Sequence, residues 1–218
     1  SVVNGRLAPK EEAEKALKAF DEIEMPAAVN REAVRLGERL LFNVGYGIVK
    51  AGYGELSIPT IIENEDGKIC YLLQSRAWTN KTFSIIFPVE DMYTSHWDAE
   101  SLWSYRSEKH ISEGKYKKNS WVEFDQVNNY AITKKHRIKT YPKVQDMLSS
   151  FYFARTLNFD VGDTVPIPNH TDDKNYPVNV IAHKKERVTV PAGTFDCLVV
   201  EPVLLTPGLF NQKGRILI

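Results

Sequence analysis

The chain has 218 residues and carries no formal net charge, because 28 Lys and Arg residues balance 28 Asp and Glu residues. Its basic runs are short, which argues against a nucleic-acid partner, since binding to a phosphate backbone depends on concentrated positive charge. No apolar stretch reaches the ~20 residues that a membrane-spanning helix needs.

Residues 1–36 are predicted to be an N-terminal helical extension. Within them, 9–23 has apolar residues at helical spacing, with Pro9 in the first turn and favourable Glu11/Lys15 and Glu14/Lys18 pairs. A short helical turn is expected over 31–36. The chain starts at Ser1 without a Met, so we expect any signal peptide to have been removed.

Residues 37–218 are predicted to form one β-rich domain. Leu40, Phe42 and Val44 alternate with more polar residues in the segment 39–48, which predicts a strand with one face on a core. An Asp-Gly turn within 63–68 predicts a hairpin. Further strands are expected at 53–62, 69–78, 102–111, 121–126 and 130–138, and the alternation of Phe83, Ile85 and Phe87 also suggests a strand.

The segment 146–157 departs from this pattern, because Asp146 suits a helix N-cap and apolar residues follow around most of a helix. We predict a buried helix on the concave side of the sheet, with a continuous core strand as the alternative. Strands are then expected at 164–167, 176–190, 194–203 and 214–218, and the apolar end at Ile218 suggests that the closing strands are incomplete. The fold class is therefore mainly β: a single curved antiparallel meander sheet or half-barrel with one buried helix.

No catalytic, metal or cofactor motif is present. The sequence contains no Gly-x-Ser-x-Gly elbow, and Cys70 and Cys197 are expected to be small buried hydrophobic residues, with a disulfide as the alternative. His96-Trp-Asp98 and His170-Thr-Asp-Asp173 place imidazole near carboxylate, but the five histidines lack the paired spacing of a metal site. We therefore predict no catalytic residue, no metal and no cofactor.

Charged residues in apolar surroundings are the candidate binding residues. Arg76, Asp91 and Arg155 have apolar neighbours, and charge in such surroundings is costly unless it is paired. We expect an arginine–carboxylate bridge that involves Asp91 or Glu186, acting either as a structural pin between helix and sheet or as part of an anion-recognising pocket.

Several segments together resemble a family of exported bacterial proteins, the domain of unknown function DUF3108. The resemblance lies in Gly37-Glu-Arg-Leu-Leu-Phe-Asn-Val-Gly-Tyr46 with Lys50-Ala-Gly52, Ser75-Arg-Ala77, Pro88-Val-Glu-Asp91, Glu113-Gly-Lys-Tyr-Lys117, Asp146-Met-Leu-Ser149, Phe151-Tyr-Phe-Ala-Arg155 and Arg187-Val-Thr-Val-Pro-Ala-Gly-Thr-Phe-Asp-Cys197. It implies a protein exported by a Gram-negative bacterium to the periplasm or envelope, with a curved antiparallel sheet. By analogy of shape, such a sheet is similar to the open half-barrels of lipoprotein carriers.

The leading functional prediction is a non-catalytic envelope protein that binds a hydrophobic or amphipathic ligand, or a partner segment, in its curved sheet. The predicted contacts are Arg76, Asp91, Arg155 and Glu186 for polar groups, and Phe42, Tyr46, Tyr71, Leu73, Phe83, Phe87, Phe151 and Tyr152 for apolar ones. One alternative is a structural or assembly protein with a filled core and an exposed strand edge. Another is an envelope glycan hydrolase that uses carboxylates such as Asp91 and Glu186.

Overall fold

The structure, a computed structural model, describes residues 30–46, 49–158, 160–175, 177–204 and 216–217. The helix predicted over 9–23 lies outside the described residues. The described chain begins with a short 3-10 helix, η1 (Arg31–Ala33), which confirms a helical turn within the predicted segment 31–36.

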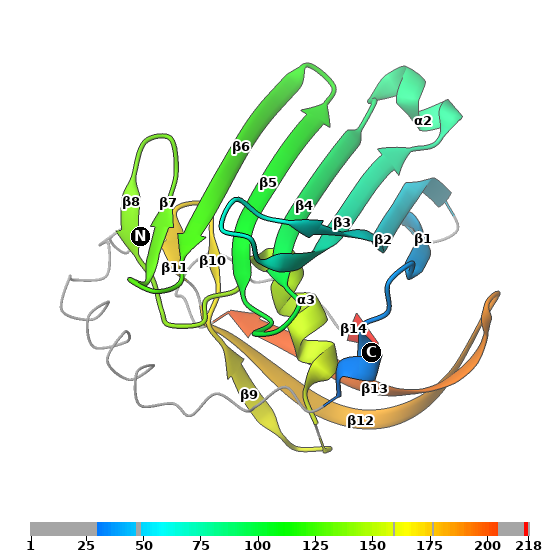
Figure 1. Ribbon diagram of the computed structural model, residues 1–218. Helices are drawn as coiled ribbons and strands as arrows, with labels where there is room; N and C mark the ends of the chain where they lie inside the picture. Colours follow the sequence, from blue (N-terminus) through cyan, green and yellow to red (C-terminus); the bar gives the residue numbers. More distant parts are fainter. Residues whose placement is uncertain (1–29, 47–48, 159, 176, 205–215, 218) are drawn as a thin grey trace, which may run out of the picture.

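Eight strands form one large antiparallel sheet in which each strand pairs with its neighbours in sequence (Figure 1). They are β1 (Arg39–Tyr46), β2 (Val49–Glu63), β3 (Ile69–Thr79), β4 (Glu90–Asp98), β5 (Ser104–Glu113), β6 (Tyr116–Asp125), β7 (Tyr130–Ile132) and β8 (Arg137–Lys139). The predicted β-rich fold with a curved antiparallel meander is thus confirmed.

One prediction on the middle of this sheet is wrong, and one of its strands is missing from the predicted elements. The segment with alternating Phe83 and Ile85 is a short helix, α2 (Lys81–Ile86), because the Asn80 side chain accepts hydrogen bonds from the Thr82 and Phe83 amides and starts a helical turn. Strand β4 was not expected at all, because polar residues interrupt it; its buried face includes Tyr93 and Trp97.

The predicted buried helix is confirmed as α3 (Met147–Thr156), and the alternative of a strand is excluded. The buried Asp146 carboxylate caps it by accepting hydrogen bonds from the amides of Leu148 (2.8 Å) and Ser149 (2.9 Å). The same carboxylate accepts hydrogen bonds from the hydroxyls of Ser95 on β4 and Ser104 on β5. The cap therefore also fastens α3 to the large sheet.

The strands after α3 form a separate sheet instead of continuing the meander. Its order is β14 (Ile216–Leu217), β13 (Gly193–Leu204), β12 (Val178–Val190) and β9 (Thr164–Ile167), and all pairs are antiparallel. A two-stranded hairpin, β10 (His170–Thr171) and β11 (Lys174–Asn175), lies between β9 and β12 in sequence and beside β7 in space (Figure 1).

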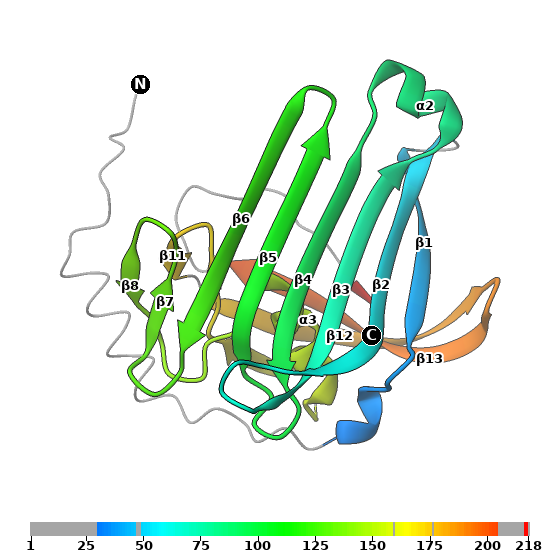
Figure 2. The same ribbon diagram turned by 45° about the horizontal axis from the view of Figure 1, so that its top comes forward.

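The main hydrophobic core lies where α3 is packed against both sheets. Leu73 and Trp97 from the large sheet are fully buried against Tyr152 of α3, and Val180 of β12 belongs to the same cluster. Figure 2 shows α3, β12 and β13 beneath one end of strands β1–β6, whereas the end that carries α2 extends beyond them.

This arrangement overturns the expectation for the first strand. Leu40 is half-buried, but Phe42 and Val44 are 46% and 50% exposed because they lie toward the end of the edge strand that extends beyond the core. The expectation for the cysteines is met in part, because Cys70 is buried and Cys197 is half-buried, and both are free thiols.

Candidate functional site

Arg155 makes an ion pair, but not with either predicted partner. Its guanidinium donates two hydrogen bonds to the Glu38 carboxylate, at 2.6 and 2.7 Å, and both side chains are largely buried. Burial disfavours the charged guanidinium, yet the hydrogen bonds and charge of Glu38 outweigh that effect and raise the pKa of Arg155. The pair joins α3 to the segment just before β1. Arg155 therefore acts as a structural pin, the first of the two roles expected for a bridge of this kind.

Two of the aromatic residues predicted to contact a ligand, Phe151 and Tyr152 of α3, belong to the packed core. Tyr152 is fully buried and its ring lies 6.5 Å from that of Trp97, while half-buried Phe151 packs edge-on against Tyr152. Tyr71 and Leu73 also pack in this core. The concave interior at α3 is therefore filled, as the structural alternative expected.

Arg76 and Asp91 line one shallow pocket of about 260 Å³ in the large sheet. Arg76 of β3 aligns with Met92 of β4, which places both on the face opposite to the buried Tyr93. The Arg76 guanidinium lies 3.9 Å from the exposed Glu90 carboxylate, whereas Asp91 accepts a hydrogen bond from the Ser112 amide at 2.8 Å.

Glu186 lies away from these residues, on β12 of the second sheet. Its exposed carboxylate pairs with the ammonium of Lys184 at 2.6 Å. Asp91 and Glu186 therefore belong to different sheets and have separate partners, which gives no support to the carboxylate pair that the glycan-hydrolase alternative required.

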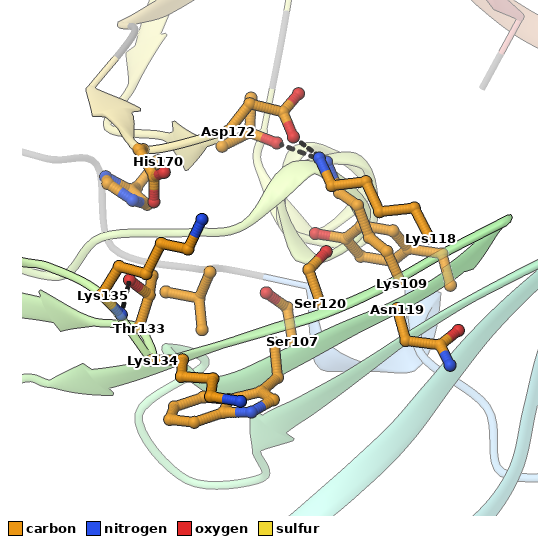
Figure 3. A pocket seen from close by; sticks show the side chains of 15 residues that line it. Ser107, Lys109, Lys118, Asn119, Ser120, Thr133, Lys134, Lys135, His170 and Asp172 are labelled. Carbon is orange, nitrogen blue, oxygen red and sulfur yellow. Dashed lines mark hydrogen bonds and ion pairs between the residues drawn. The ribbon is translucent and has the colours of Figure 1, made fainter. Parts of the chain in front are cut away.

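Another pocket, of about 330 Å³, lies elsewhere, over strands β5 and β6 (Figure 3). Its floor follows from strand register: Ser107 and Lys109 of β5 lie opposite Val122 and Ser120 of β6, so these four side chains share one face of the sheet. Lys118 continues this face on β6.

The β10–β11 hairpin forms one wall of this pocket. Asp172 and Asp173 both have positive φ, 48° and 60°, as a two-residue hairpin turn requires. The ammonium of Lys109 donates to the carboxylate of Asp172 at 2.8 Å and to the hydroxyl of Thr171 at 3.2 Å, which ties the hairpin to the floor. Asn175 anchors its other strand by donating to the Lys139 carbonyl at 2.7 Å.

The turn between β7 and β8 forms another wall, in a segment predicted to be one strand. The Thr133 hydroxyl accepts hydrogen bonds from the amides of Lys135 (3.3 Å) and His136 (3.0 Å), so the chain reverses here and forms a hairpin. This turn places Lys134 and Lys135 at the pocket. In Figure 3, Lys135 extends toward the space between the sheet and the hairpin that carries His170.

His170 is a buried imidazole in the wall of this pocket. The side-chain nitrogen of Asn175 donates to the Lys139 carbonyl, so the side-chain oxygen of Asn175 faces His170 and accepts a hydrogen bond from its Nδ1 at 2.7 Å. Burial lowers the pKa of His170 and favours its neutral form, and Nε2 has no partner among the described residues.

The pocket combines positive charge with hydroxyl groups. Lys118, Lys134 and Lys135 have no ion-pair partner in the described part of the chain, whereas Lys109 is paired with Asp172. The hydroxyls of Ser107, Ser120, Thr133 and Thr171 line the same space. Such a set of donors suits a phosphate or carboxylate group.

Sequence reasoning missed this site, although two signals for it were present. The basic runs 115–118 and 134–137 are too short to predict a polyanion partner, and the His-Thr-Asp-Asp segment 170–173 is typical of metal ligands more than of an anion site. Across the residues that the structure describes, no three His, Cys, Asp or Glu side chains gather as metal ligands would. Nor does the described chain contain a helix with the length and hydrophobicity needed to cross a bilayer.

Comparison with known proteins gives a family but no activity. The model of a family described as "Protein of unknown function (DUF3108)" matches residues 41–218. No curated protein matches the chain. A crystal structure of a DUF1089 family protein from Pseudomonas aeruginosa is similar at 10% identity and a TM-score of 0.44, over 81% of this chain and 90% of that one.

Proposed function

Because the chain belongs to the DUF3108 family, whose function is unknown, we propose a function from the geometry: the protein is a non-catalytic binding protein for a small anionic ligand. The ligand occupies the pocket between β5–β6, the β7–β8 turn and the β10–β11 hairpin. The proposal rests on three lysines that line one cavity together with hydroxyl groups, Lys118, Lys134 and Lys135, none of which forms an ion pair with a described residue. They outnumber the acidic residues of the lining, Asp172, which pairs with Lys109, and Asp173.

The size of the cavity limits the ligand. At about 330 Å³ it lies near the lower end of the ~300–1,000 Å³ range of small-molecule sites. The lining combines the lysines and hydroxyl groups with apolar surface from Tyr93, Trp121 and Val122. A compact phosphate- or carboxylate-bearing molecule fits this chemistry better than the hydrophobic ligand predicted from sequence, because the interior at α3 is filled.

An exported, envelope-facing location is part of this proposal. It is supported by the resemblance to exported proteins and is tested by fractionating the native host and probing the periplasm and membranes for the full chain.

Thermal unfolding with three probes tests the binding site. We expect glycerol 3-phosphate to raise the melting temperature most, inorganic phosphate less, and glycerol not at all, because the lysines recognise the anion and the hydroxyls recognise the polyol. Lys134→Ala/Lys135→Ala should weaken binding of glycerol 3-phosphate by about tenfold, the effect of losing roughly 1–2 kcal/mol of charge-assisted contacts.

Lys139→Ala is the matched control, because Lys139 is an exposed lysine on neighbouring β8 that does not line the pocket. Equal weakening by Lys139→Ala would show a general charge effect instead of a site. Failure of both anions to stabilise the wild-type protein would reject the proposal.

A further inference from the structure

The end of the large sheet that carries α2 lies away from α3 (Figures 1 and 2). Several apolar residues of α2 and of the strands and turns at this end are exposed, and together they are called the distal tip. Ile85 and Ile86 of α2 are 85% and 81% exposed. The other exposed apolar members are Phe42, Val44, Val49, Phe87 and Tyr116. Isolated exposed hydrophobic residues are ordinary, but a cluster from three neighbouring loops and strand ends indicates an interaction surface.

The helix that presents Ile85 and Ile86 is held by specific hydrogen bonds. Asn80 caps α2 through its side-chain oxygen, and its side-chain nitrogen donates to the Lys50 carbonyl of β2 at 2.6 Å. After α2, the Val89 amide donates to the Thr79 hydroxyl at 3.0 Å, which closes the loop. The two isoleucines are therefore exposed on an anchored element.

The β5–β6 turn contacts the connection between β3 and β4 that carries α2. The Gly114 amide of the β5–β6 turn donates to the Pro88 carbonyl at 2.7 Å. Gly114 has φ +57°, and a Cβ added there would lie 2.9 Å from the Phe87 ring, so the turn and the aromatic side chain are in close contact. The β3–β4 connection and the β5–β6 turn thus form one continuous tip.

The charge around the tip is mainly positive. Lys50, Lys81, Lys115 and Lys117 are exposed and make no ion pair within the described structure. The nearby acidic residues are Glu90, which lies 3.9 Å from Arg76, Asp91, which accepts a hydrogen bond from the Ser112 amide, and Glu113. An apolar centre flanked by lysines is typical of proteins that rest on an anionic lipid surface.

We propose that the distal tip docks onto an anionic bilayer surface. Ile85 and Ile86 insert at the boundary of headgroups and acyl chains, while Lys81, Lys115 and Lys117 contact lipid phosphates. The charge also argues against a second copy of the chain as the occupant, since a two-fold contact between identical tips would bring lysines against lysines.

This inference is independent of the proposed anion pocket, which lies over β5–β6 beside the β10–β11 hairpin. A protein that failed to bind glycerol 3-phosphate could still bind vesicles, and the reverse also holds. The two proposals therefore stand or fall on separate measurements.

Co-sedimentation of the full chain with vesicles tests the proposal. We expect binding to vesicles of phosphatidylcholine mixed with phosphatidylglycerol, little binding to phosphatidylcholine alone, and weaker binding at high salt. Ile85→Ser/Ile86→Ser should lower the vesicle partition coefficient about tenfold or more, because it removes the inserted apolar area. Lys115→Glu/Lys117→Glu should lower binding to the anionic vesicles selectively.

Val127→Ser is the matched control, since Val127 is 90% exposed in the β6–β7 turn, outside the distal tip. Circular dichroism should show that all variants fold, because every substituted side chain is exposed. The proposal is overturned if wild-type protein does not sediment with anionic vesicles, or if Val127→Ser reduces sedimentation as much as the isoleucine variant. Loss of a wild-type dimer in the isoleucine variant, without vesicle binding by either protein, would overturn it in favour of self-association.

Discussion

Burial shifts the pKa values of two residues, Asp146 and His170, in opposite directions. Burial raises the pKa of Asp146, although hydrogen bonds from Ser104, Ser95 and the helix amides oppose this effect. Burial lowers the pKa of His170, and the hydrogen bond to Asn175 opposes it. In both cases the neutral form is favoured, as expected where water is excluded.

The lowered pKa of His170 predicts a pH-dependent stability. The folded state binds this proton less readily than the unfolded state, whose histidine pKa is about 6.5, so stability is present above that pH and falls as the solution is acidified. Asp172 and Asp173 favour protonation of the imidazole and Lys109 disfavours it. Thermal unfolding between pH about 7.5 and about 5.5 should show a smaller loss of melting temperature for His170→Gln than for the wild type.

Burial also lowers the pKa of His96. His96 therefore contributes to the loss of stability on acidification in both the wild type and His170→Gln, and only the difference between the two proteins reports on His170. Identical pH slopes for His170→Gln and wild type would contradict the expected role of His170.

Among the elements, α3 is held by polar contacts at both of its ends. Its first turn is fastened to β4 and β5 through Asp146, and its last turn to the segment before β1 through Arg155 and Glu38. The helix is therefore bound at both ends to the large sheet, while its apolar side chains fill the core.

Breaking the Arg155–Glu38 pair should destabilise the fold. Arg155→Met is expected to lower the free energy of unfolding by about 3 kcal/mol, because the largely buried Glu38 carboxylate loses its partner. Removing the second charge as well, in Arg155→Met/Glu38→Leu, should recover part of the loss. Chemical denaturation of the two single variants and the double variant measures the coupling.

Arg187→Met is the control for this cycle, since the Arg187–Asp196 pair is exposed and should contribute little. If Arg155→Met were as stable as Arg187→Met, the pin between α3 and the large sheet would be refuted.

At the scale of the whole molecule, the main core joins the two sheets. Side chains from the large sheet, α3 and the β9–β12–β13 sheet belong to one hydrophobic cluster. By contrast, the exposed apolar residues of the distal tip lie outside this cluster, and the proposed anion pocket borders it at Tyr93.

A shared core predicts that residues 37–218 unfold as one unit. Denaturant transitions followed by far-UV circular dichroism, which reports both sheets, and by near-UV circular dichroism, which reports packed aromatics such as Trp97, should coincide. A far-UV signal that changes in two steps would indicate that the second sheet unfolds by itself and would contradict a single domain.

The sequence by itself determined the local structure wherever one short-range signal dominated. The Asp-Gly turn before β3 and the Asp146 cap of α3 were predicted, because each depends on residues close together in the chain. The period-2 pattern predicted most strands of the large sheet but failed at α2 and missed β4. The family was also recognisable from its motifs and is confirmed over residues 41–218.

Tertiary structure alone decided which distant residues meet. It paired Arg155 with Glu38, moved the last strands into a second sheet, and brought Lys118 and Lys135 to one pocket beside His170. Periodicity shows which side chains share a face of one strand, but not which other strand or turn covers that face, because this depends on packing free energies summed over the whole chain.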